Sequence, residues 1–142
     1  MVTDLKSVPS YLKRSKEEIM PAEYKIDKSQ RMVFSVAYGI LTDLDINSHQ
    51  EKLRDDPDFD PGFSQLVDCT NVTKADDLST DAIYELARRN LFGAESQRAF
   101  VAPKKLLYGL FRMFQILTKD YPDELDVFRD ITEARKYLKL DR

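Results

Sequence analysis

The segment that most constrains the fold is residues 63–89, FSQLVDCTNVTKADDLSTDAIYELARR, where an apolar run leads through a polar turn into a helix pattern. The apolar run predicts a buried strand that ends near Asp68. Ser79 occupies an expected helix N-cap position, and Asp81 follows where a carboxylate complements the helix dipole. An open α/β sheet places its functional loop where a strand leads into a helix, so we expect the site in this turn.

The remainder of the chain continues the alternation of strand and helix patterns. Only a short turn separates the first two predicted strands, which indicates a hairpin, whereas helix patterns separate the later ones. We therefore predict an α/β fold in the order β-β-α-β-α-β-α-β-α, with a mixed, mostly parallel sheet of about five strands and helices packed on it. The predicted strands are residues 23–27, 32–41, 64–69, 97–102 and 125–129, and the predicted helices are residues 43–54, 80–92, 104–120 and 131–140.

Large and small side chains alternate along the second predicted strand, so each kind occupies one face of the sheet. We expect the face with the larger side chains to pack against helices. That face carries Phe34, Val36, Tyr38 and Ile40, and the other carries Val33, Ser35, Ala37 and Gly39.

The chain has 142 residues, a hydrophobic content of 42% and a net charge of −3. This length fits one domain, and the lack of a basic excess argues against a general nucleic-acid binder. Residues 1–22 are polar and hold two prolines, so we interpret them as an N-terminal arm, with a short helix over 10–20, before a single domain over 23–142. A lone cysteine, Cys69, and the lack of a signal peptide core or a membrane-length apolar run predict a cytoplasmic protein.

The order of elements and the turn after Asp68 resemble the STAS domain of bacterial anti-sigma factor antagonists, over about residues 23–140. In STAS domains a strand ends in Asp, and an Asp-Ser-Ser-Gly motif eight residues later opens a helix whose second serine is phosphorylated. Here Asp76 matches the Asp of that motif, Asp77 and Leu78 stand at the two serines, and Ser79 stands at the glycine. A one-residue insertion would place Ser79 at the phosphorylated position. Residues 56–68 and 98–114 resemble an uncharacterised STAS-like bacterial group, and the likeness to CRAL-TRIO lipid-binding domains is more distant.

The resemblance implies a non-enzymatic regulatory module that binds a protein partner, kinase-like or sigma-regulating, through this turn and the following helix. Phosphate at a helix N-terminus meets free N–H groups, which makes Ser79 and Thr80 candidates for phosphorylation. The neighbouring carboxylates oppose a phosphate, and a simple N-cap role for Ser79 is the alternative. STAS-like domains occur alone and as homodimers, and both states stay open. The candidate residues are Asp68, Asp76, Asp77, Ser79, Thr80, Tyr84, Arg88 and Arg89.

A different function follows from residues 104–120, which form a basic amphipathic helix pattern. Such a helix can lie on an anionic membrane or cover an apolar ligand, so the alternative is a lipid carrier or sensor, peripheral at the membrane. A core helix with a solvated basic face would explain the same pattern. In the carrier hypothesis Phe111, Met113 and Phe114 line the pocket, and Lys105, Arg112 and Lys119 face phosphates.

Residues that would support catalysis or metal binding are few. The only histidine, His49, falls on the inward stripe of helix 43–54, where a buried, hydrogen-bonded role is expected. Asp56, Asp58 and Asp60 have EF-hand spacing, but Pro61 replaces the glycine of that motif. The sequence also lacks a glycine-rich phosphate loop and cysteine–histidine metal spacing. We therefore expect no catalytic residue, no metal and no cofactor.

Overall fold

The computed structural model describes residues 22–140, so the predicted arm and its short helix lie outside the described residues. Five strands and four helices follow the predicted order. The strands are β1 (Ala22–Asp27), β2 (Met32–Ile40), β3 (Ser64–Lys74), β4 (Gln97–Val101) and β5 (Glu124–Phe128). The helices are α3 (Asp43–Asp55), α4 (Thr80–Arg88), α5 (Lys105–Leu117) and α6 (Ile131–Tyr137).

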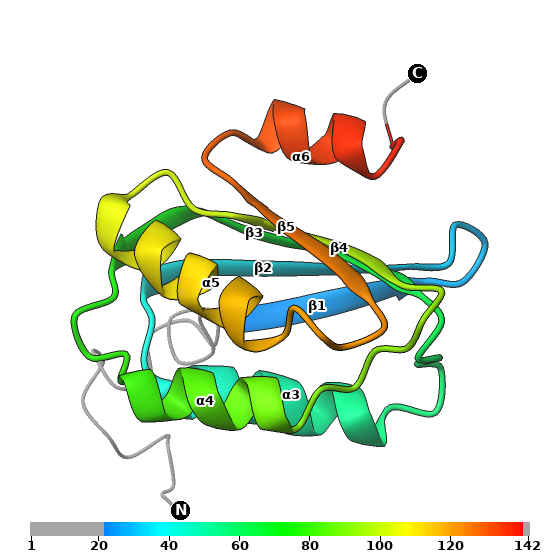
Figure 1. Cartoon of the computed structure of the whole chain (residues 1–142), viewed down its shortest axis with the longest axis horizontal. Coiled ribbons are helices and arrows are strands. Elements are labelled where there is room, and N and C mark those ends of the chain that lie inside the picture. The colour runs from blue at the N-terminus through cyan, green and yellow to red at the C-terminus, as the bar shows by residue number, and fades with distance from the viewer. Residues whose placement is uncertain (1–21, 141–142) are drawn as a thin grey trace, which may run out of the picture.

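The strands form one sheet in the order β1-β2-β3-β4-β5, with β1 antiparallel to β2 and the other pairs parallel (Figure 1). Each parallel strand lies next to its predecessor in the chain, always in the same direction across the sheet. Because βαβ crossovers are right-handed, this order brings the three connecting helices, α3, α4 and α5, to the same face. The helix after the last strand, α6, covers the opposite face. The predicted mixed, mostly parallel α/β fold is therefore confirmed.

The main core lies between the sheet and the layer of three helices. Phe100 of β4 packs against Phe111 and Phe114 of α5, with ring centroids 4.9 and 5.4 Å apart. A smaller core joins Leu66, Val101 and neighbouring side chains to Ala134 of α6. Both faces of the central strands are thus buried, as expected for parallel strands.

The expectation for the faces of β2 was wrong in one respect. The small side chains of Ser35 and Ala37 lie beneath the three-helix layer. On the larger-residue face, Phe34 packs against α6, but Ile40 is 55% exposed. The reason is topological: the crossovers place three helices on the small-residue face and leave one short helix to cover the other.

Several predicted boundaries also change, among them the end of α6, which is Tyr137 and not 140. β3 continues to Lys74 because the second half of β2 pairs with it, through register shifts near Gly39, whose φ is +68°. Asp68 therefore lies inside the strand and not at its end. α4 ends at Arg88, not 92, where the chain turns to bury Phe92. α5 spans Lys105–Leu117, not 104–120.

Candidate functional site

The carboxyl ends of β2, β3 and β4 meet at one edge of the sheet, where α3, α4 and α5 begin (Figure 1). The turn between β3 and α4 lies at this edge. Ala75 and Leu78 are buried and anchor the turn, and the Leu78 amide donates to the Ala75 carbonyl at 3.1 Å. Between them, Asp76 and Asp77 are exposed. The turn thus holds two carboxylates outward on a fixed backbone.

Ser79 ties the starts of two helices together. Its hydroxyl donates to Asp43 Oδ2 at 2.6 Å, and its amide donates to Asp43 Oδ1 at 2.8 Å. The same hydroxyl accepts a hydrogen bond from the Ala82 amide at 3.0 Å, which is the N-cap interaction expected from the sequence. Thr80, the next residue, is exposed at the first position of α4.

Three large apolar side chains are exposed at this same edge. Leu44, in the first turn of α3, is 72% exposed, and Ile40 at the end of β2 and Leu106 at the start of α5 are 55% and 52% exposed. We call these three residues, with Asp76 and Asp77, the carboxyl-edge surface. Neither Ile40 nor Leu44 was predicted from the sequence as a site residue. Leu44 falls off the inward stripe of helix 43–54, and that signal could have identified it.

The other residues predicted for partner binding lie in two places. On α4, Tyr84 is 54% exposed and Arg88 is exposed, with an ion pair of 2.6 Å to Glu85. Asp68 is separate: it lines a groove of about 390 Å³ on the α6 side, together with Phe34 and other residues. The structure therefore does not bring Asp68 together with the turn.

The candidate residues of the predicted helix 104–120 divide into an exposed and a buried set. Lys105, Arg112 and Lys119 are exposed, whereas Phe111 and Phe114 are buried against Phe100. Met113 is partly buried against the same core. This arrangement fits a core helix with a solvated basic face.

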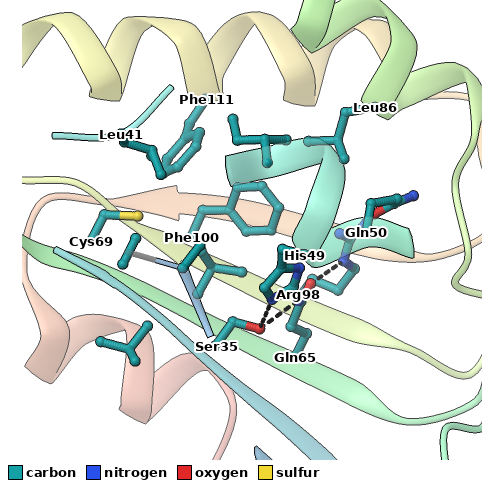
Figure 2. A pocket seen from close by; sticks show the side chains of 15 residues that line it. Ser35, Leu41, His49, Gln50, Gln65, Cys69, Leu86, Arg98, Phe100 and Phe111 are labelled. Atoms are coloured by element: carbon teal, nitrogen blue, oxygen red, sulfur yellow. Dashed lines mark hydrogen bonds between the residues drawn. The ribbon is translucent and has the colours of Figure 1, made fainter. Parts of the chain in front are cut away.

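A small cavity of about 70 Å³ lies beneath the three-helix layer (Figure 2). Phe111 lines it, but Met113 and Phe114 do not. Its apolar walls include Leu41, Cys69, Leu86 and Phe100, and Cys69 is only 2% exposed. Ser35, His49, Gln65 and Arg98 add polar groups on one side, as Figure 2 shows.

These polar side chains form a buried network across β2, β3, β4 and α3. His49 Nε2 lies 2.9 Å from Ser35 Oγ, and Gln65 Nε2 donates to the same oxygen at 3.0 Å. Arg98 Nε donates to Gln65 Oε1 at 3.0 Å. Beyond it, Arg98 forms a buried ion pair of 3.4 Å with Asp123. The network satisfies polar groups that would otherwise be costly to bury.

Burial lowers the pKa of His49 to about 4, and the nearby positive charge of Arg98 acts in the same direction. The imidazole is therefore neutral at neutral pH. It is hydrogen-bonded, as expected from the sequence, but the residue is partly rather than fully buried. A neutral imidazole beside a hydroxyl has the composition of a base and nucleophile pair. Ser35, however, is only 4% exposed, so this hydroxyl is enclosed by protein.

No family model and no curated protein matches the sequence. Among solved structures, the chain is similar to an uncharacterised DUF3478-family protein from Shewanella loihica, described as having a SpoIIAA-like fold. The match has a TM-score of 0.52 and 21% sequence identity, and it covers 82% of this chain and 93% of that one. The chain has a SpoIIAA-like fold. Because this is the STAS fold, the STAS-like prediction is confirmed for the architecture.

Residues 22–140 contain neither a helix that could span a membrane nor a cluster of residues that could hold a metal ion. None of their helices is both long enough and apolar enough to cross a membrane. Within the same residues, no three His, Cys, Asp or Glu side chains gather as a group that could hold a metal ion.

Proposed function

We propose that this SpoIIAA-like domain is a non-enzymatic regulatory module that binds a protein partner through the carboxyl-edge surface. The observation that carries the proposal is Leu44, a large apolar side chain 72% exposed on a helix start that Asp43 and Ser79 hold in place. Exposed apolar side chains rimmed by charge are typical of interaction sites. The fold also favours this function, because SpoIIAA-like domains are generally regulatory rather than catalytic.

The chemistry of the surface indicates what the partner presents. Ile40, Leu44 and Leu106 supply apolar contact area, and Asp76 and Asp77 supply negative charge. A matching partner surface has an apolar centre with lysine or arginine at its rim. Tyr84 and Arg88 are exposed further along α4 and are candidates for additional contacts. The partner class we propose is a kinase-like or sigma-regulating protein, as the STAS resemblance implies.

Phosphorylation would act at the same place. Thr80 is exposed at the N-terminus of α4, where a phosphate meets the helix dipole. Phosphate on Ser79 would lose the bond to Asp43 and would face that carboxylate. Of the two hydroxyls, we therefore propose Thr80 as the better acceptor.

Site-specific photo-crosslinking tests the proposal directly. A photoreactive amino acid would replace Leu44 in one protein and Ile116 in another, both expressed in the native cell. Ile116 is the matched control because it is 64% exposed on α5, distant from the start of that helix. We expect a discrete crosslinked protein at position 44 that is absent at position 116. Absence of an adduct at 44, or the same adducts at both positions, would refute it.

The cavity supports a second candidate function, the binding of an apolar ligand. A volume of about 70 Å³ holds only a few heavy atoms, so a lipid chain would need α4 or α5 to move outward. In this proposal Phe111, Met113 and Phe114 would contact the chain, and Lys105, Arg112 and Lys119 would face anionic headgroups.

Sedimentation with anionic vesicles at low salt tests this second function. Binding that the wild type shows and an R112E/K119E variant loses would support it, since both residues are exposed. Failure of the wild type to sediment would remove the membrane version.

A further inference from the structure

The outer edge of β1 suggests a second interaction, which does not depend on the proposed function. Within residues 22–140, β1 stands at the end of the sheet and pairs only with β2. Its second row of backbone N–H and C=O groups therefore faces no strand of the described part of the chain. Such an edge is a template on which another extended strand can add.

The side chains of β1 separate cleanly onto the two faces of the sheet. Glu23 and Lys25 are exposed on the α6 side, where both line the groove beside Phe34. Tyr24 lies on the α3 side, where its hydroxyl donates to Asp56 Oδ2 at 2.7 Å. A strand that joins this edge must therefore match Glu23 and Lys25, with Asp27 on the same face at the end of the strand.

We propose that β1 pairs antiparallel with β1 of a second copy of this chain, about a two-fold axis through Tyr24 and perpendicular to the sheet. This register places Glu23 opposite the partner's Lys25, and Lys25 opposite the partner's Glu23. Ala22 then lies opposite the partner's Ile26 on the other face. Residues directly opposite in an antiparallel pair have Cβ atoms about 4.5–5.5 Å apart, close enough for both ion pairs. The two five-stranded sheets become one continuous sheet.

The charge pattern selects this register over its neighbours. A two-fold axis perpendicular to the sheet keeps each face on its own side, so the register can shift only in steps of two residues. One such shift places Lys25 opposite the partner's Lys25 and Glu23 opposite the partner's Asp27. The opposite shift places Glu23 opposite the partner's Glu23. Like charges directly opposite are unfavourable, so the charges favour this register over both of its neighbours.

Existing contacts hold Glu23 ready for this pairing. Tyr38 Oη donates to Glu23 Oε2 at 3.0 Å, which keeps the carboxylate over the α6 face. Pairing also brings together the grooves of the two copies, because Glu23 and Lys25 line each groove at its β1 side. The dimer would thus have one continuous groove across the two-fold axis, lined in part by apolar residues such as Phe34.

Charge reversal with a molar-mass measurement tests the proposal. Size-exclusion chromatography with light scattering should show a concentration-dependent dimer for the wild-type full chain. Glu23→Lys and Lys25→Glu should each give a monomer, although they change the net charge in opposite directions. The E23K/K25E double variant, which restores opposite charges across the axis, should dimerise again. Lys119→Glu, at an exposed residue after α5, is the matched control and should stay dimeric.

A mixing experiment makes the test stricter. A mixture of the two single variants should form a heterodimer, because every opposed pair then joins a lysine to a glutamate. Hydrogen exchange at the β1 amides should slow as the wild-type concentration rises. A wild type that is monomeric throughout, or single variants that dimerise as well as the wild type, would overturn the proposal. Dimerisation without slower β1 exchange would assign the contact to another surface and would overturn it equally.

Discussion

His49 is the only histidine of the chain, and its surroundings favour the neutral form of the ring. Ser35 meets its Nε2, the ring of Tyr24 packs edge-on at 5.4 Å, and the positive charge of Arg98 is near. Desolvation and a neighbouring cation both favour the neutral imidazole. A histidine that is ordinary in the sequence thus becomes a group whose titration reports on the packing of the interior.

We predict that the imidazole of His49 titrates with a midpoint near 4 in the folded protein. The measurement is an NMR pH titration, which needs no assignment because the chain has one histidine. A midpoint near the unperturbed value of about 6.5 would show that the ring is solvated and would contradict the structure.

The same residue gives the sign of a pH effect on stability. Because the folded pKa of His49 lies below its unfolded value of about 6.5, the unfolded state binds more protons between these two values. The contribution of His49 is therefore fully present above about pH 6.5 and is lost as the pH falls toward 4. Replacement of His49 by glutamine should remove this part of the pH dependence in urea unfolding experiments.

At the scale of elements, the junction of α3 and α4 depends on one bidentate contact. Asp43 accepts from both the amide and the hydroxyl of Ser79, and the hydroxyl also caps α4. Two helix starts that are far apart in the sequence are thereby fixed side by side. The position of Leu44 in the carboxyl-edge surface depends on this junction.

We predict that Ser79→Asp destabilises the domain, although aspartate is itself a good N-cap residue. It would lose a hydrogen bond to a carboxylate, worth about 1.5–3 kcal/mol, and would place two carboxylates together. Thr80→Glu is the matched control, because an acidic residue at an exposed helix start is neutral or slightly stabilising. Urea unfolding of the two variants measures the difference, and equal free energies of unfolding would refute the role of Asp43.

The sequence was sufficient to predict the strands and helices, but not the contacts that form at their ends. Apolar periodicity located each strand and helix, and the N-cap role of Ser79 followed from its place before a helix pattern. The extension of β3 to Lys74 could not be predicted, because it depends on pairing with β2 through shifts near Gly39. The bond from Ser79 to Asp43 joins residues 36 positions apart, and no local pattern encodes it.

At the scale of the whole molecule, a chain of polar contacts crosses the sheet beneath the helices. It begins at His49 of α3 and reaches Arg98 of β4 through Ser35 and Gln65. Arg98 continues it to Asp123, just before β5, and its guanidinium lies 4.1 Å from the centre of the Phe92 ring. Burial lowers the pKa of Arg98 to about 10, which still leaves it charged at neutral pH. Sequence patterns did not reveal this network, because its members are isolated polar residues in apolar strands.

We predict that Arg98→Met costs about 3–5 kcal/mol of unfolding free energy, because it leaves Asp123 as a buried carboxylate without its cation. That is a large part of the 5–15 kcal/mol that typically stabilises a domain. Arg88→Met is the matched control: its ion pair with Glu85 is exposed, so the cost should stay below about 1 kcal/mol. Chemical denaturation of both variants gives the comparison, and similar costs would contradict a structural role for the buried pair.

Cys69, the only thiol of the chain, lies 2% exposed on the wall of the cavity, and burial raises its pKa. Because Cys69 is so buried, we expect a thiol reagent to reach it only when the structure opens locally, so each labelled molecule records one such opening. The labelling of Cys69 therefore reports the local opening of the folded protein. The rate of labelling, followed as a single mass increment, would show how often the interior becomes accessible without any engineered probe.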